Sequence, residues 1–423
     1  MKSLMRFLFL VQRYAPAVGG SEWYIRRLGE NLASMGHEVK VLATSAIEVD
    51  ALWRRDALRT QAGAETINGV KVVRLKPRYL PFHGKTMTLL AFLPLPEARY
   101  RYSMPGPLLP PFDEISRTAG DFDLVHASAL PFSSIIRAAS RLAASRGVPF
   151  VVTPFMHLGI KNRIGYGYRK SYQIELLSEA DVIIAATPTE RNALIELGIN
   201  ADKVKFTGLG IDTSSLPPGD GEAFRKRHNI EGHIVFNVSA RTFDKGAQHT
   251  VDAMRLLWKR GVSARLVMAG PARRDFRKYM DSLPADDKRR IIDLGVVDSR
   301  TKADLFAAGD VFCMPSRAES FGLVYLEAWH YGAAVVAARS GAIEDIIRHE
   351  NDGLLAPFGD CEAIANAVGK LLDDEKAAAA MVEAGRKRLE GEFNCSRSFD
   401  KYYEIVRELS GRLNNNGGRS DVA

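Results

Sequence analysis

The chain has 423 residues, of which 46% are hydrophobic and 26% charged, the proportions of an ordinary globular protein. This composition excludes a disordered, collagen-like or coiled-coil chain, and the length predicts roughly two to three domains. Lys and Arg outnumber Asp and Glu by 58 to 50, and the resulting formal charge of +8 suits an anionic small ligand, an anionic membrane or a nucleic acid.

Three widely spaced cysteines without a Cys-x-x-Cys pair favour a reducing compartment over a disulfide framework or a zinc site. The apolar run from Phe7 to Val11 is shorter than the ~7–15 residues of a signal-peptide core, so it predicts a first buried strand. No stretch approaches the ~18 apolar residues that a spanning helix needs. We therefore expect a soluble, cytoplasmic protein.

The same unit of strand, glycine-containing loop, helix and strand occurs in both halves of the chain. The first copy is predicted at 7–11, 15–20, 21–35 and 38–43, and the second at 234–239, 240–246, 247–260 and 264–269. Strand, helix, strand at this spacing predicts a βαβ unit, so each half should hold a parallel sheet covered by helices. Further short apolar runs predict additional buried strands at 124–127, 149–153, 182–186, 204–207, 311–314 and 334–338.

These patterns predict a domain at 1–213, a second domain at 214–390, a C-terminal helix at 391–411 and a disordered polar tail at 412–423. The boundary follows a cluster of Pro and Gly residues between 217 and 221. In such α/β domains, ligands bind at the carboxyl ends of the strands.

Residues 77–111 depart from the pattern, because they carry eight of the 19 prolines together with aromatic and basic residues. One interpretation is a long surface insertion. The other is a basic, aromatic flap for a lipid-linked or membrane-bound acceptor.

The stretch 315–332 is the most informative for chemistry. A predicted strand ends at Met314, a polar loop containing Glu319 follows, and an almost wholly apolar helix containing Glu327 begins near Leu323. A buried carboxylate needs hydrogen-bond partners, and ligand hydroxyls would serve for both acids. The backbone amides of Ser320, Phe321 and Gly322 stand at the helix start, where an anion is favoured. Alternatively, Glu319 is only a helix-terminal acid and Glu327 is ion-paired in the core.

Other candidate ligand-binding residues follow predicted strands. Arg241 and Lys245, in the loop after 234–239, suit a diphosphate, although a solvated basic loop would look the same. Gly19 and Gly20 precede the first helix and would let a ligand approach the backbone. His126 and His157 follow buried strands and are candidates for sugar or proton-handling contacts at cleft-facing strand ends, or are structural.

In combination, these residues resemble the GT-B glycosyltransferases of family 4, over about residues 6 to 405. Glu319 and Glu327 match the family's E-x7-E motif. The other matching pieces, in chain order, are Gly19-Gly20-Ser21-Glu22, Leu124-Val-His126, Arg241…Lys245-Gly246, Pro315-Ser316, Ser320-Phe-Gly322, Ser340-Gly341 and Asn351-Asp-Gly353. The resemblance implies an α/β, GT-B fold in which two doubly wound Rossmann-like domains face each other across a cleft.

The resemblance also implies an activity and roles for the site residues. The chain would be a retaining hexosyltransferase-type enzyme that uses a UDP- or GDP-sugar and no obligatory metal or other cofactor. Arg241 and Lys245 would hold the diphosphate together with the amides of 320–322, and Glu327 would hold the ribose. Glu319 and His157 would be the catalytic residues at the donor sugar. From the first domain, Gly19 and Gly20 would contact the phosphate.

We expect the acceptor to be a glycan or a lipid-linked molecule in polysaccharide, lipopolysaccharide or glycolipid biosynthesis. Peripheral contact with an anionic membrane, at the inner face of the plasma membrane, would fit the flap interpretation of 77–111. An alternative function is a sugar-nucleotide epimerase or hydrolase on the same scaffold. Nucleic-acid binding is disfavoured, because no basic stripe with interleaved aromatic residues occurs.

Overall fold

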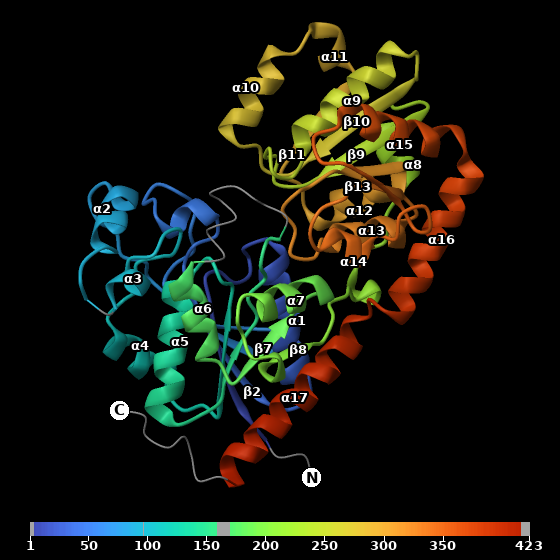
Figure 1. The fold of residues 1–423 in the computed structure, drawn as a ribbon. Helices are drawn as coiled ribbons and strands as arrows, with labels where there is room; N and C mark the ends of the chain where they lie inside the picture. The colour runs from blue at the N-terminus through green and yellow to red at the C-terminus, as the bar shows by residue number, and fades with distance from the viewer. Residues whose placement is uncertain (1–3, 96, 159–169, 416–423) are drawn as a thin grey trace. The chain divides into compact units, whose positions relative to one another are not determined.

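The computed structural model describes residues 4–95, 97–158 and 170–415 of the chain (Figure 1). These residues form two compact units. Unit 1 contains residues 4–156, 170–207 and 397–415, and unit 2 contains residues 157–158 and 208–396. The predicted domain boundary at 213/214 lies six residues beyond the change of unit between Thr207 and Gly208.

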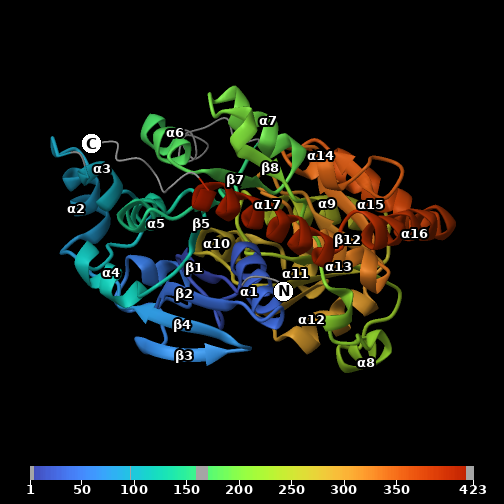
Figure 2. The same cartoon turned by 90° about the horizontal axis from the view of Figure 1, so that it is seen from below.

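Unit 1 is built on an eight-stranded sheet of order β3-β4-β2-β1-β5-β6-β7-β8, parallel except for the β3–β4 pair. Its strands are β1 (Arg6–Val11), β2 (Glu38–Thr44), β3 (Gly63–Ile67), β4 (Val70–Leu75), β5 (Leu124–Ser128), β6 (Phe150–Val152), β7 (Val182–Ala185) and β8 (Val204–Phe206). The central strands are mostly apolar and, apart from Arg6 at the start of β1, buried, as expected for a parallel sheet covered on both faces. Figure 2 shows β3 and β4 at the edge of this unit.

The helices of unit 1 connect these strands. They are α1 (Gly20–Ser34), α2 (His83–Leu90), α3 (Ala98–Arg101), α4 (Phe112–Ala119), α5 (Ser133–Arg146), α6 (Ser171–Ser178), α7 (Pro188–Glu196) and most of α17 (Cys395–Asn415). The last of these packs on unit 1 through its aromatic side chains: Phe399 contacts Tyr24 of α1, and the Tyr402 hydroxyl lies 3.0 Å from His126 Nδ1 of β5. The α17 helix begins and ends later than the predicted 391–411. Residues 412–415 of the predicted disordered tail are therefore helical, and residues 416–423 lie outside the described residues.

Unit 2 holds a six-stranded parallel sheet of order β11-β10-β9-β12-β13-β14. Its strands are β9 (His233–Val238), β10 (Ala264–Ala269), β11 (Ile291–Gly295), β12 (Val311–Met314), β13 (Ala334–Ala338) and β14 (Leu354–Ala356). The strand order reverses between the neighbours β9 and β12, so the loops that follow these two strands emerge side by side at the carboxyl edge. This is the position at which open α/β sheets bind ligands.

The helices of unit 2 are α8 (Gly221–Arg227), α9 (Ala247–Lys259), α10 (Arg274–Ser282), α11 (Ala285–Arg289), α12 (Ser299–Ala308), α13 (Leu323–Tyr331), α14 (Ile343–Ile346), α15 (Cys361–Asp373) and α16 (Glu375–Gly391). The core of this unit forms where α9 and α15 pack on the sheet, with Met254, Leu257 and Val368 among its buried members. A firm core beneath the carboxyl edge fixes the strand ends from which the site loops start.

The predicted βαβ units and the later apolar strands are confirmed to within one or two residues at each end. Sequence analysis missed four strands: the β3–β4 hairpin and the short strands β11 and β14.

Candidate active site

The loops after β9 and β12 are clamped together. Gly246 ends the first loop in the left-handed conformation, with φ of 70°, and a β-carbon there would fall 2.2 Å from the Pro315 carbonyl oxygen. Only glycine combines this backbone with so close an approach. The Arg317 guanidinium bonds the Asp244 carboxylate at 2.7 Å, which ties the loops a second time. The side chains that these loops carry are therefore held in place before any ligand arrives.

Lys245 and Glu319 meet at this junction. Lys245 Nζ donates to Glu319 Oε1 at 2.6 Å and to the Ala318 carbonyl at 3.0 Å. Glu319 is 8% exposed, and its backbone pairs with that of Leu158 from the segment after β6. An ammonium and a carboxylate in contact, at the switch point of the sheet, can share a ligand that carries both negative charge and hydroxyl groups.

The start of α13 follows directly. Ser320, Phe321 and Gly322 lead into Leu323, and Gly322 caps the helix with φ of 94°. A β-carbon on Gly322 would fall 2.6 Å from the Tyr325 ring, so the turn into the helix is tight. Because the first N–H groups of a helix have no intrahelical acceptor, this end of α13 favours an anion.

Glu327 lies further along α13 and is 9% exposed. Its Oε1 accepts a hydrogen bond from Lys302 Nζ of α12 at 2.7 Å. Oε2 lies at the same distance from that nitrogen, yet it is buried and has no well-directed hydrogen bond within the described part of the chain. The ion pair that sequence analysis weighed as an alternative is thus present and involves both carboxylate oxygens, of which only Oε2 lacks a well-directed hydrogen bond.

Arg241 is held by the protein itself. Its Nε and Nη2 donate to the Gly270 carbonyl at 3.1 and 2.7 Å, its Nη1 lies 2.6 Å from Asp293 Oδ2, and the guanidinium packs over the Phe276 ring. Sequence analysis expected this residue at the diphosphate. To reach one, the guanidinium would have to exchange Asp293 for phosphate, so the expected role stays a prediction.

His157 and His126 differ in their burial and in their surroundings. His157 is half-buried, and burial, together with the Lys245 ammonium, lowers its pKa, so the ring is neutral at pH 7. A neutral ring beside Lys245 can exchange hydrogen bonds with hydroxyls without adding charge. His126, expected at a cleft-facing end, is fully buried between Thr153 Oγ1 (2.8 Å) and the Tyr402 hydroxyl (3.0 Å). That expectation was wrong because β5 is a central strand, covered on both faces.

Two family models match consecutive parts of the chain. The model described as "Glycosyl transferase 4-like domain" matches residues 19–210, and "Glycosyl transferases group 1" matches residues 220–388. The chain belongs to the group 1 glycosyltransferases. It therefore transfers a sugar from a nucleotide sugar, and the comparisons do not support the alternative of an epimerase or hydrolase.

Relatives and solved structures agree with this family. A D-inositol 3-phosphate glycosyltransferase of Acidothermus cellulolyticus is 29% identical over 84% of this chain and 78% of its own length. A GDP-mannose-dependent phosphatidylinositol dimannoside mannosyltransferase of Mycobacterium tuberculosis is 26% identical over 86% of this chain and 87% of its own length. The Thermosynechococcus elongatus sucrose-phosphate synthase superposes with a TM-score of 0.72 at 20% identity, over 96% of this chain and 100% of that one. The crystal structure of Anabaena HepE with UDP-glucose superposes with a TM-score of 0.71 at 19% identity, over 96% of this chain and 100% of that one. The fold is GT-B.

In unit 1 of this glycosyltransferase, the loop after β1 ends at Gly19, and Gly20 is the first residue of α1. A β-carbon on Gly19 would lie 2.2 Å from Glu22 Oε2, whereas Gly20 has open space around its α-carbon. Glu22 is buried against Arg13 at 2.7 Å and accepts from Gln12 at 2.9 Å. Gly19 is thus needed for the loop to close over this pair, which sequence analysis missed. Because Gly19 and Gly20 belong to unit 1 and the other site residues to unit 2, their predicted phosphate contact stays a prediction.

Glu190 of α7 is a second residue that sequence analysis missed. Its two oxygens accept from the backbone N–H groups of Met156 and Ala186, each at 2.6 Å, and the side chain is fully buried. Burial raises the pKa of this carboxyl to about 7. By holding Met156, Glu190 fixes the backbone immediately before His157. The sequence signal was Thr187-Pro-Thr-Glu190, a helix start with an acid three residues after the cap.

Within the residues that the structure describes, no group of three or more His, Cys, Asp or Glu side chains is arranged to hold a metal ion. Asp121 and Asp123, which fit an Asp-x-Asp pattern, instead pair with Arg6. None of the described helices combines the length and the apolar character needed to cross a bilayer.

Proposed function

We propose that the chain is a retaining glycosyltransferase whose donor diphosphate is bound at the junction of the loops after β9 and β12. The observation that carries this proposal is the contact of Lys245 with Glu319 at 2.6 Å, beside the start of α13. One cation, the N-terminal end of a helix and a carboxylate converge there, as a charged phosphate next to a hydroxyl-bearing sugar requires.

The proposed chemistry depends on stabilising the negative charge of the leaving diphosphate. When the bond between the donor sugar and the diphosphate breaks, the leaving diphosphate gains negative charge. Lys245 and the amides of Ser320 to Gly322 would stabilise it, because the clamped loops hold the backbone of these residues close to one another. As Lys245 turns to the phosphate, Glu319 would be released to accept hydrogen bonds from the sugar hydroxyls. The resemblance to retaining enzymes of the family implies that the anomeric configuration is kept.

The remaining site residues would position the donor. Glu327 Oε2, which has no well-directed hydrogen bond, would accept a ribose hydroxyl. His157, neutral and beside Lys245, would contact the donor sugar. Arg241 would strengthen the diphosphate contact if it left Asp293, and Gly19 and Gly20 would supply a close backbone approach from unit 1. The donor would be a UDP- or GDP-sugar.

A ligand screen tests this proposal. UDP, GDP, ADP and their sugars are added singly and the melting temperature is recorded, since a bound ligand raises it by mass action. We expect the nucleotides of one base to raise the melting temperature more than those of the other two. Glu319→Gln should then lose transfer activity while keeping affinity for the nucleoside diphosphate, and Glu383→Gln, an exposed acid of α16, is the matched control. The proposal fails if no nucleotide stabilises the wild type, or if both variants transfer sugar equally.

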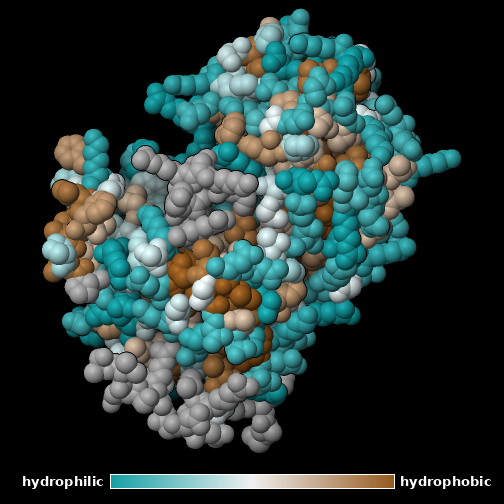
Figure 3. All heavy atoms as spheres, viewed as in Figure 1, coloured by the Kyte–Doolittle hydropathy of each residue, from teal (hydrophilic) through white to brown (hydrophobic). Residues whose placement is uncertain are grey.

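We further propose that residues 77–111 bring the enzyme to an anionic membrane that carries a lipid-linked acceptor for polysaccharide or glycolipid biosynthesis. Side chains of this segment expose apolar surface to an unusual degree, with Phe82 86% and Phe92 81% exposed and Leu89, Leu93 and Leu95 also exposed. Figure 3 shows hydrophobic atoms gathered over α2. Exposed Lys85 and Arg101 lie in the same segment, and apolar side chains next to cations suit an anionic lipid surface.

Vesicle flotation tests the membrane proposal. The wild type should float with vesicles of phosphatidylglycerol and phosphatidylcholine and stay behind with phosphatidylcholine alone. The double variant Leu89→Ser/Phe92→Ser should lose this binding, whereas Val296→Ser, which changes a 75% exposed residue of unit 2, should not. Equal flotation of wild type and double variant would refute the proposal.

A further inference from the structure

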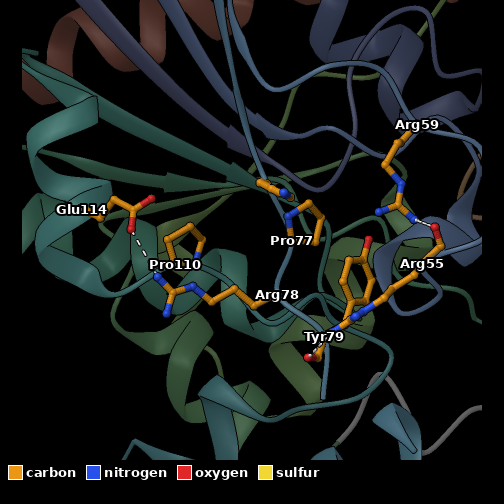
Figure 4. Close-up of a pocket in the computed structure, with 8 residues that line it drawn as sticks. Arg55, Arg59, Pro77, Arg78, Tyr79, Pro110 and Glu114 are labelled. Atoms are coloured by element: carbon orange, nitrogen blue, oxygen red, sulfur yellow. Dashed lines mark hydrogen bonds and ion pairs between the residues drawn. The ribbon is translucent and has the colours of Figure 1, made fainter. Parts of the chain in front are cut away.

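Unit 1 contains a cavity that the donor site does not use. It opens where β4 ends, has a volume of about 640 Å³, and is lined by two prolines and by Arg55, Arg59, Lys76, Arg78, Tyr79 and Glu114 (Figure 4). We call it the basic pocket. Lys76 is the first residue after β4, so the pocket lies at the carboxyl edge of its sheet, the edge at which open α/β sheets take ligands.

The basic pocket carries four cationic side chains and one carboxylate. Glu114 lies 3.4 Å from Arg78, and both side chains are about half exposed. The other three cations form no ion pair with any described residue: Arg55 and Arg59 donate to backbone carbonyls, and Lys76 is exposed. Because like charges repel one another, placing them in one cavity lowers the stability of the folded chain, and a bound anionic ligand would offset that loss.

Two of these cations, Arg55 and Arg59, are held in place by the Tyr79 ring and by backbone carbonyls. The Arg59 guanidinium lies over the Tyr79 ring, 5.1 Å from its centroid, and its Nη2 donates to the Arg54 and Arg55 carbonyls. The Tyr79 hydroxyl in turn donates to the Ala51 carbonyl at 2.7 Å. Arg55 lies near the same ring, with its carbon Cζ 5.8 Å from the centroid. A ring anchored at its hydroxyl thus fixes two guanidinium groups, which reduces the ordering cost of binding.

We propose that the basic pocket binds the phosphate group of the acceptor. Three cations that form no ion pair with a described carboxylate match an anionic phosphate, which the forks of Arg and the point charge of Lys both recognise. The cavity is larger than a phosphate alone and has the size of a small-molecule site, so a sugar or polyol ring would fit beside the phosphate. The acceptor is therefore a phosphorylated sugar or polyol, either free or as a lipid headgroup. This inference rests on the proposed function, because it names the acceptor class of the same enzyme.

Calorimetry on the full chain tests this inference with D-inositol 3-phosphate and with unphosphorylated inositol as probes. Vesicle binding compares phosphatidylinositol with phosphatidylglycerol, each at the same fraction in phosphatidylcholine. We expect the wild type to bind a phosphorylated probe and to bind it less tightly as salt rises. Tighter binding of the soluble phosphate, with no preference for the phosphatidylinositol vesicles, identifies a free acceptor; preferential binding of the phosphatidylinositol vesicles identifies a headgroup. Either result supports the basic pocket if the variants below respond.

The variants are Arg55→Ala/Lys76→Ala, which removes two unpaired and exposed cations, and Lys71→Ala, an exposed lysine at the other end of β4. The double variant should bind the phosphorylated probe or vesicle at least tenfold more weakly, since a hydrogen bond to a charged group contributes about tenfold or more. Lys71→Ala should bind as the wild type does. Nucleoside diphosphate binding should be equal in all three proteins.

Two results would overturn the inference: no binding of either phosphorylated form by the wild type, or equal binding by the wild type and the double variant. If the wild type binds UDP or GDP in the same preparation, those results refute the proposed role of the basic pocket but not the proposed function. If no nucleoside diphosphate binds either, the proposed function fails as well.

Discussion

Replacing Lys245 by alanine removes the cation that is proposed to face the donor diphosphate. Its ammonium now bonds Glu319 at 2.6 Å and the Ala318 carbonyl at 3.0 Å. Losing a charge-assisted hydrogen bond to phosphate should cost about 1.5–3 kcal/mol of binding free energy, or about a 10- to 150-fold loss of affinity. The uncompensated Glu319 carboxylate would repel the diphosphate, which adds to the loss.

The same substitution should lower the free energy of unfolding, because Glu319 is 8% exposed and would lose its cation. The Lys245 side chain is 23% exposed, so water would partly replace it and the cost should be about 1 kcal/mol, the low end for an unpaired buried group. Adding Glu319→Gln removes the stranded charge. The double variant should therefore regain stability and the part of the affinity lost to repulsion, but not the part contributed by the Lys245 ammonium.

Isothermal titration calorimetry with the nucleoside diphosphate that the wild type binds measures the affinity, and urea unfolding measures the stability. Lys259→Ala, an exposed lysine at the end of α9, is the matched control. Wild-type affinity in Lys245→Ala would remove this residue from the diphosphate site and refute the reasoning.

Three further predictions follow from single contacts. Glu327→Ala should weaken binding of the nucleoside diphosphate but not of free pyrophosphate, which lacks a ribose; equal calorimetric losses for both would show that Glu327 does not contact the ribose. Because burial raises the folded-state pKa of Glu190 from about 4.5 to about 7, the wild type should lose about 3 kcal/mol of stability from this group as pH rises from 4.5 to 7. Glu190→Gln should lack that part of the slope in urea unfolding, and an unchanged slope would contradict the assignment. Gly246→Ala should lower the free energy of unfolding by about 2 kcal/mol or more, since alanine must adopt a left-handed backbone and its β-carbon meets the Pro315 carbonyl; a loss within experimental error would mean that the two loops are not clamped.

Local sequence patterns predicted the parts of the fold that they determine. Fully apolar strands such as 311–314 and 334–338 are buried on both faces, so their composition alone marks them. The β3–β4 hairpin was missed because Gly63–Ile67 is an exposed edge strand with little apolar character. Its turn did carry a signal, since Asn68 and Gly69 both adopt positive φ, the pair typical of a tight hairpin.

The candidate site was predictable as a set of residues but not as a set of contacts. The spacing of Glu319 and Glu327 placed both acids around one helix start, and the loop after β9 placed Lys245 nearby. The partners of Arg241, namely the Gly270 carbonyl and Asp293, come from the ends of two other strands 29 and more residues away, so no local pattern could reveal them. Likewise, His126 could be assigned to the core only once α17 was seen to place Tyr402 against it.

A crystal structure of the enzyme with the nucleoside diphosphate that stabilises it would test the central claim most directly. Our account predicts phosphate oxygens within hydrogen-bond distance of Lys245 Nζ and of the backbone amides at the start of α13, with the ribose hydroxyls on Glu327. Phosphates bound away from both Lys245 and the start of α13 would contradict it.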